Sequence, residues 1–134
     1  ERGKVFDYFV LLQPTSPLRD KEDIIKAIEL INEKKAESVV SVCPVKHSPL
    51  WTNTLPENLN MNNFLGEHNK RRQELADYYR INGAIYISEV NAYLRNRNFY
   101  SERSYAYVMD YRKSLDIDDL DDFELGEYFL TKGK

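Results

Sequence analysis

The 134-residue sequence contains one cysteine, two histidines and only five glycines, which are widely scattered. A single cysteine excludes an internal disulfide framework, and so few cysteines and histidines form no zinc-ligand pattern. No glycine-rich phosphate-binding loop of the Walker type is present. Cys43 lies in the apolar run 38–43, which favours a buried and inert thiol. This cysteine usage fits a reducing, cytoplasmic compartment.

Long hydrophobic stretches and an excess of basic charge are also missing. No run approaches the roughly 18 apolar residues of a membrane-spanning helix. The formal net charge is −3 and the pI is about 5.5, whereas a nucleic-acid-binding protein normally carries a basic face. We therefore expect neither a membrane nor a nucleic acid as partner. The length and the 42% hydrophobic content fit one domain or part of one.

The most informative stretch is the apolar run 8–12 together with the turn that follows it. An unbroken apolar run of this length is typical of a strand buried on both faces, usually in a parallel sheet. Two prolines end the run, and Gln13, Thr15 and Ser16 supply hydrogen-bonding side chains directly beyond it. Ligands of open α/β sheets bind at this end of the strands, which makes the three side chains candidate ligand contacts. An ordinary strand-to-helix turn is the alternative.

Helix and strand patterns alternate along the rest of the chain. Asp20 is a candidate N-cap for a helix whose sheet-facing stripe consists of Ile24, Ala27, Ile28 and Ile31. Three further apolar runs predict strands, namely 38–43, 84–87 and 105–109. A helix capped by Ser88 and a last helix with an apolar face over 123–130 complete the pattern. The alternation predicts an α/β fold with a mostly parallel sheet and flanking helices.

The segment 52–70 has a different composition from its surroundings. It is rich in asparagine and shows no helical or strand periodicity, so a loop or an irregular hairpin is expected there. A short basic cluster follows at 70–72. On composition alone this cluster is typical of a solvated charge run.

Two carboxylates flank Ile117 near the end of the chain. In an extended backbone, Asp116 and Asp118 face the same side and direct two hard oxygen ligands to one point. Such ligands suit Mg²⁺, which takes phosphate oxygens and water as its other ligands. The alternative is a set of acidic residues at a helix N-terminus, because further aspartates follow within 119–122.

Four segments, in order, resemble the acylneuraminate cytidylyltransferases, which are the CMP-sialic acid synthetases. They read LLQPTSPLR at 11–19, RRQEL at 71–75, NGAIYI at 82–87 and SLDID at 114–118. The resemblance implies a fold of the nucleotide-diphospho-sugar transferase type, which is Rossmann-like, with a protruding dimerisation arm over 45–81. It further implies that residues 1–134 form the carboxyl-terminal part of a single cytidylyltransferase domain, incomplete at the amino terminus. The nucleotide-binding strand and loop are expected before Glu1.

The activity implied by this resemblance is cytidylyl transfer from CTP to a nonulosonic (sialic) acid, with release of pyrophosphate. The enzyme would be a Mg²⁺-dependent homodimer whose metal ligands and catalytic residues are Asp116 and Asp118. The substrate contacts implied are Gln13, Thr15, Ser16, Arg72, Arg80, Asn82, Tyr86, Phe99 and Tyr100.

Several of these residues have specific expected roles. Arg72 would bind the sugar carboxylate through two parallel hydrogen bonds. Tyr86 would hold a sugar oxygen, and Phe99 and Tyr100 would line the pocket around the acyl group, with core packing as the alternative for all three. Two other functions remain open from the sequence. One is a noncatalytic sugar-binding and dimerisation fragment, and the other is an interaction domain that presents the acidic run 116–122 to a basic protein.

Overall fold

The computed structural model describes residues 3–66 and 71–132, without the side chain of Arg72. The chain divides into two compact units. The larger unit comprises Glu1–Cys43 and Ile81–Lys134, and the smaller comprises Pro44–Arg80. Among the described residues, no helix is long and apolar enough to cross a membrane.

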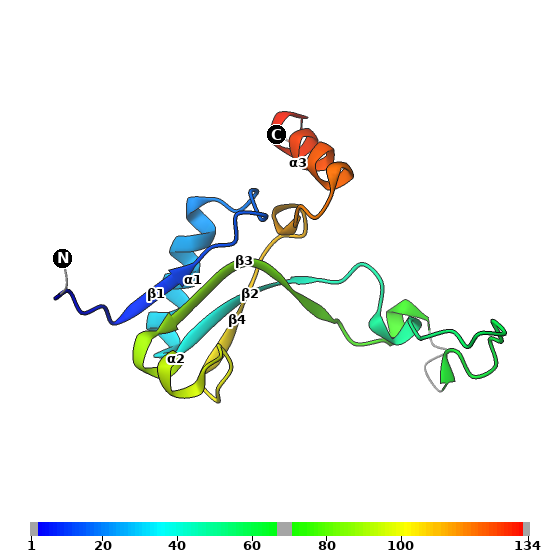
Figure 1. The fold of residues 1–134 in the computed structure, drawn as a ribbon, viewed down its shortest axis with the longest axis horizontal. Helices are drawn as coiled ribbons and strands as arrows, with labels where there is room; N and C mark the ends of the chain where they lie inside the picture. The colour runs from blue at the N-terminus through cyan, green and yellow to red at the C-terminus, as the bar shows by residue number, and fades with distance from the viewer. Residues whose placement is uncertain (1–2, 67–70, 133–134) are drawn as a thin grey trace. The chain divides into compact units, whose positions relative to one another are not determined.

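A mixed four-stranded sheet is built by the described strands (Figure 1). In the order β1-β3-β2-β4 these are Tyr8–Leu11, Tyr79–Glu89, Ser38–Pro44 and Ser104–Val108. β1 pairs antiparallel with β3, so that Val10 lies opposite Ile87. β4 pairs parallel with β2, so that Val40 lies opposite Ala106. The α/β class is confirmed, whereas the sheet combines both pairing modes.

The prediction for the first strand is wrong in two respects. β1 is antiparallel to its neighbour, and Tyr8, Val10 and Leu11 are all exposed, with only Phe9 partly buried. The reason is that β1 is an edge strand among the described residues. None of the residues that form the buried core comes from it.

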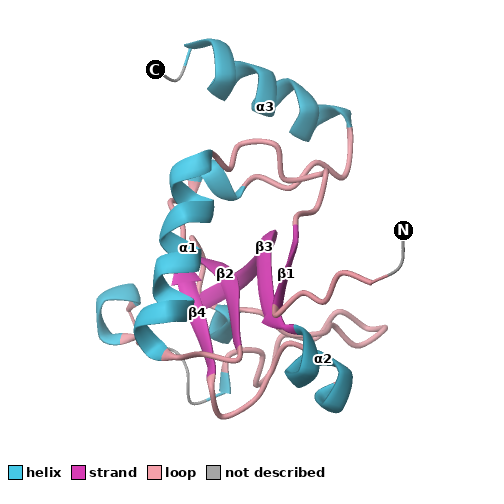
Figure 2. Cartoon of the chain, turned by 90° about the vertical axis from the view of Figure 1, so that its left-hand side faces the viewer, coloured by secondary structure: helices cyan, strands magenta, loops and turns pink. Residues whose placement is uncertain are grey.

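Helix α1, Lys21–Lys34, covers one face of the sheet (Figure 2). Asp20 is its N-cap as predicted: its carboxylate accepts from the Asp23 N–H at 3.1 Å, and the Asp23 carboxylate accepts from the Asp20 N–H at 3.0 Å. This reciprocal arrangement is a capping box and satisfies two otherwise unpaired donors. Ala27 and Ile31 are buried, but Ile28 is exposed, so the packed stripe is narrower than predicted.

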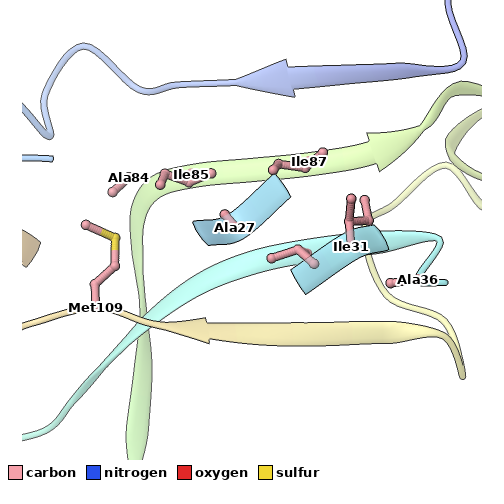
Figure 3. Packing of buried hydrophobic residues seen from close by; sticks show 8 residues of the cluster. Ala27, Ile31, Ala36, Ala84, Ile85, Ile87 and Met109 are labelled. Carbon is pink, nitrogen blue, oxygen red and sulfur yellow. The ribbon is translucent and has the colours of Figure 1, made fainter. Parts of the chain in front are cut away.

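The core lies between α1 and the inner strands (Figure 3). Ile85 and Ile87 of β3 and Val39 of β2 pack against Ala27 and Ile31 of the helix. The strand expected at 38–43 is present as β2 and is almost wholly buried. Its Cys43 is a buried free thiol, as the sequence predicts.

The predicted cap at Ser88 is wrong. Helix α2 spans Val90–Asn96 with Glu89 at its N-cap position and no side-chain cap. Ser88 still belongs to β3, and its hydroxyl is buried and donates to the carbonyl oxygens of Glu37 and Glu89. Because β3 continues to the start of α2, the Ser88 hydroxyl bonds to these backbone carbonyl oxygens and does not cap the helix.

Helix α3, Leu120–Lys132, confirms the predicted last helix. Most of its apolar side chains are nevertheless exposed, including Phe123, Tyr128 and Leu130. Gly126 is buried and lies against the side chains of Leu115 and Ile117.

The smaller unit consists mainly of turns in its described part. Its regular elements are the 3-10 turns Pro49–Trp51 and Arg72–Glu74 and the first residues of β3. Asparagine side chains bond to nearby backbone, as when the Asn58 and Asn60 carbonyl oxygens accept from backbone two residues ahead. Such local bonds compete with helix and sheet formation, which accounts for the predicted loop.

Candidate functional site

The turn that follows β1 is held rigidly by its own residues. The Arg19 guanidinium donates to the carbonyl oxygens of Gln13 at 2.6 Å and Ser16 at 2.8 Å. Ser16 is fully buried, and its hydroxyl donates to the Asn82 carbonyl oxygen at 3.4 Å. The turn is therefore fixed to strand β3, and the buried Ser16 serves this attachment.

Gln13 lies directly against the backbone of Gly83. Gly83 has a φ of +74°, a left-handed conformation that favours glycine, and a Cβ atom at this position would overlap the Gln13 carboxamide oxygen. The absence of a side chain at this glycine thus permits a close approach of Gln13 to the backbone. It brings Gln13 onto the strand that carries Tyr86.

The acidic segment joins the same turn. The N–H of Ile117 donates to the carbonyl oxygen of Thr15 at 2.8 Å, so the aspartates on either side of Ile117 lie beside the polar turn. Asp116 is partly buried, and its Oδ1 is fully buried with no hydrogen-bond partner in the described chain. Asp118 is exposed. Thr15 and Ile117 are 102 positions apart in the sequence, and the fold brings their segments together.

The remaining aspartates in the run 116–122 include two that cap helix α3. Asp119 accepts from the Asp122 N–H at 3.0 Å, and Asp122 accepts from the Asp118 N–H at 3.1 Å. The helix-terminus interpretation thus holds for Asp119 and Asp122. Asp116 takes no part in the capping bonds, which leaves its carboxylate for another role.

Tyr86 combines aromatic packing with proximity to Asp116. Its ring lies 5.0 Å from that of Phe99, which also packs against Phe9 and Tyr93. Burial raises the pKa of the Tyr86 phenol above its ordinary value, and Tyr100 and Asp116 add to this shift. The hydroxyl therefore stays protonated at neutral pH and is available as a hydrogen-bond donor. Phe99 belongs to this aromatic cluster, whereas Tyr100 is exposed.

Asn82 is buried and bonds entirely within the protein. Its side-chain Oδ1 accepts from the Ser41 hydroxyl at 2.6 Å and the Ala84 N–H at 3.2 Å. Its amide group donates to the Ser114 hydroxyl at 2.8 Å and the Met109 sulfur at 3.3 Å. A carboxamide has two donor hydrogens and two acceptor positions. All four are occupied here, so the side chain offers none to a ligand.

The two arginines expected at the site both belong to the smaller unit, whereas the polar turn and the acidic segment belong to the larger one. Arg80 is an exposed residue at the end of the smaller unit. The side chain of Arg72 lies outside the described residues, and only its backbone, in a 3-10 turn, is described. Their expected roles remain predictions.

No preformed metal cage is visible. In the described ranges, no three side chains of His, Cys, Asp or Glu gather at one point. The donor set at the turn is nevertheless suitable for a hard cation, because the buried Asp116 oxygen is unpaired and a buried unpaired carboxylate oxygen is costly. Mg²⁺ commonly uses only one or two protein carboxylates.

Sequence reasoning missed the groups that support this site. Ser41 is a polar residue inside an apolar strand. Because a buried hydroxyl needs a hydrogen-bond partner, the sequence alone could have indicated a buried polar contact at this position. Lys113 bonds to Asp20 and Asp23, which are about 90 residues earlier in the chain, and no local pattern points to that contact.

Comparison with known proteins shows what the sequence resembles. No family model matches the chain. It is 42% identical over 86% of its length to N-acylneuraminate cytidylyltransferase of Streptococcus agalactiae serotype V, and it covers 28% of that protein. It is 38% identical over 90% of its length to the protein of the same name from Escherichia coli O18:K1:H7, of which it covers 29%. A third relative is CMP-N,N'-diacetyllegionaminic acid synthase of Legionella pneumophila, with 35% identity over 93% of this chain and 54% of the relative.

By sequence, the chain is a homologue of part of a cytidylyltransferase. Within that class, its relatives from S. agalactiae and E. coli are named N-acylneuraminate cytidylyltransferases, which confirms the resemblance carried by the four motifs. The chain spans between 28% and 54% of the length of the three curated relatives described above.

Proposed function

We propose that the protein carrying this chain transfers a cytidylyl group from CTP to a nonulosonic acid, producing the CMP-sugar and pyrophosphate. The observation that carries the proposal is the bond from the Ile117 N–H to the Thr15 carbonyl oxygen. It joins the acidic segment to the polar turn beyond β1, where α/β folds bind ligands. The names of the relatives supply the reaction class.

The sugar would be positioned by the groups around this junction. Gln13 and Thr15 come from the turn, and the protonated Tyr86 hydroxyl donates a hydrogen bond to a sugar oxygen. Phe99 and Tyr100 border the acyl substituent. Arg72 is proposed to bind the sugar carboxylate, because a planar guanidinium makes two parallel hydrogen bonds to that group.

Asp116 and Asp118 are proposed to hold Mg²⁺. The unpaired buried oxygen of Asp116 supports this assignment, since a cation would satisfy it. When bound, the ion would neutralise charge on the phosphate oxygens during transfer. The anomeric hydroxyl of the sugar would attack the α-phosphorus and displace pyrophosphate, and one of the two carboxylates is proposed to accept the proton of that hydroxyl.

The chain is proposed to be the carboxyl-terminal part of a single cytidylyltransferase domain that acts as a homodimer. The coverage of the relatives and the missing phosphate-binding loop support the first point. For the second, the separate unit Pro44–Arg80 coincides closely with the arm expected at 45–81. Light scattering of the complete protein should give twice the monomer mass, and a monomer that retains full activity would contradict this assignment.

Pyrophosphate release tests the proposed reaction. In the complete protein, release from CTP should require both a nonulosonic acid and Mg²⁺. Asp116→Asn should reduce it at least about 100-fold, because the variant removes charge at the transition state. Asp121→Asn is the matched control, since Asp121 is an exposed aspartate of the same run. Equal activity of the two variants would reject the site, and release without the sugar would reject the reaction.

A further inference from the structure

A cluster of charged and phenolic groups adjoins the site without being used by the proposed reaction. The Lys113 ammonium lies 2.7 Å from Asp20 Oδ2 and 3.1 Å from Asp23 Oδ2. The Tyr107 hydroxyl donates to the other Asp23 oxygen at 3.2 Å. The cluster therefore links the start of helix α1 to strand β4 and to the turn that follows it.

Burial makes the lysine contact more than a surface ion pair. The side chain of Asp23 is only 7% exposed, and that of Lys113 is 36% exposed. A buried carboxylate requires compensation by hydrogen bonds and opposite charge. Asp23 receives this from Tyr107, from the Asp20 N–H and from Lys113, which contributes the positive charge.

Lys113 belongs to the 3-10 turn Arg112–Ser114, which immediately precedes the acidic segment. The next residue, Ser114, is fully buried and is held by Asn82 at 2.8 Å and by the Asp110 carbonyl oxygen at 2.8 Å. Beyond Asp116, the Ile117 N–H is held by Thr15. The backbone is thus fastened on both sides of Asp116.

This matters because the Asp116 carboxylate is not itself oriented by a hydrogen bond to its Oδ1 in the described chain. Its position therefore depends on the backbone at either side. A displacement of about 1 Å at a reacting group costs roughly 100-fold in rate. The contacts that fix this backbone are consequently expected to affect function as well as folding.

We propose that Lys113 is a positioning residue, whose ammonium, held by Asp20 and Asp23, fixes the turn that directs Asp116 toward the polar turn after β1. The proposal rests on the proposed function, because it takes Asp116 to lie at the reacting centre. Asn82, through Ser114, provides a second attachment of the same turn. Lys113 itself touches neither substrate nor metal.

The test uses the complete protein with Lys113→Met, which retains the aliphatic stem and removes the charge. Mn²⁺ is the probe, and its affinity is measured by electron paramagnetic resonance beside kcat and KM with Mg²⁺. We expect Mn²⁺ affinity to fall about 10-fold, as for other residues that orient a ligand, and kcat to fall with it. Lys113→Arg should recover most of both, because a guanidinium also spans two carboxylates.

The control is Lys26→Met, which removes an equal charge from an exposed position of the same helix that carries Asp20 and Asp23 at its start. It should leave Mn²⁺ affinity and kcat unchanged. A Lys113→Met protein that is less stable but has normal Mn²⁺ affinity and kcat below its melting temperature would overturn the proposal.

If Lys113→Met does not fold, Asp20→Asn is the second variant. It weakens the contact of Lys113 with its more exposed partner and should lower both Mn²⁺ affinity and kcat. An Asp20→Asn variant that folds with unchanged values would likewise overturn it.

Asp116→Asn separates this proposal from the function on which it rests. If Asp116→Asn abolishes Mn²⁺ binding and activity while Lys113→Met behaves like Lys26→Met, only the positioning role is rejected. If Asp116→Asn changes neither quantity, the metal site fails and the positioning role fails with it.

Discussion

β1 and β2 are both short apolar strands of one sheet, but they have different surroundings. β2 lies between β3 and β4, and six of its seven residues are buried or partly buried. β1 has β3 as its neighbour among the described strands, and three of its four residues are exposed. The buried strand β2 contributes to the packing of the fold, whereas the exposed strand β1 leads into the polar turn of the candidate site. Apolar composition alone therefore does not tell which of these roles a strand has.

The largest expected effect tests the difference in burial. Ile85→Ala should lower the free energy of unfolding by about 2–5 kcal/mol, because it leaves a cavity beneath α1. Leu11→Ala, in the edge strand, should cost about 1 kcal/mol or less, since Leu11 is already 42% exposed and lies outside the core. Urea denaturation of the two variants measures both values. Equal losses would show that the edge strand is covered in solution.

A second prediction concerns the point where the edge strand's turn meets the inner strand. Gly83→Ala should destabilise the protein by about 1–2 kcal/mol through its left-handed backbone, with a further loss from overlap with Gln13. In a Gln13→Ala background the overlap is relieved, so Gly83→Ala should cost less there. Thermal unfolding of the four proteins in this cycle gives the coupling. Additive effects would contradict the contact.

Removing the Tyr86 hydroxyl separates two roles of this β3 residue, namely the packing of its ring and the hydrogen bond of its hydroxyl. Tyr86→Phe keeps the aromatic packing with Phe99 and should leave stability within about 0.5 kcal/mol of the parent. In the complete protein, loss of the donated hydrogen bond should raise KM for the sugar about 5- to 10-fold. Tyr128→Phe, on the exposed side of α3, is the control and should change neither quantity. A large loss of stability in Tyr86→Phe would assign its hydroxyl to folding.

The smallest effect is a pH dependence at the start of α1. The hydrogen bond between Asp20 and Lys113 lowers the pKa of Asp20 from 3.8 to about 2. The same hydrogen bond raises the pKa of Lys113 from 10.5 to about 12. The Asp20 contribution is therefore present above pH 3.8 and lost as the pH falls through 2. The Lys113 contribution is present below pH 10.5 and lost as the pH rises through 12.

Denaturant unfolding of the parent and Lys113→Met between pH 2 and pH 9 measures this dependence. The difference in stability should be constant from about pH 5 to pH 9 and should shrink toward pH 2. The side chains of Asp20 and Lys113 are 49% and 36% exposed, so solvent screens their interaction and the change at acid pH is expected to be modest. A difference that grows on acidification would contradict the ion pair.

Features set by neighbouring residues could be predicted from the sequence. Asp20 as N-cap and the loop expected over 52–70 depend on local hydrogen bonds. The cap is confirmed, and so is the loop in its described part, with 67–70 outside the described residues. The exposure of β1 depends on what packs against it, and the strand contacts of Ser88 depend on where β3 ends. The sequence near these residues therefore does not predict the exposure of β1 or the contacts of Ser88.

The candidate site divides in the same way. The family resemblance assigns the acidic pair and the turn at Gln13 to one site, and the Thr15–Ile117 bond brings the backbones of the two segments together. The commitment of Asn82 to Ser41 and Ser114 was not predicted, because those partners lie 41 and 32 residues away. Buried networks between distant segments require the fold to be known.

The sequence Asn82-Gly83 has a chemical consequence of its own. Asn-Gly is the dipeptide most prone to spontaneous deamidation, which begins when the glycine nitrogen attacks the asparagine side-chain carbon. Here the carboxamide is held by four hydrogen bonds and is 1% exposed. The attack needs this group to rotate away from its partners, so the folded chain protects the amide. Conversion to aspartate or isoaspartate should therefore record how often this part of the sheet opens as the protein ages.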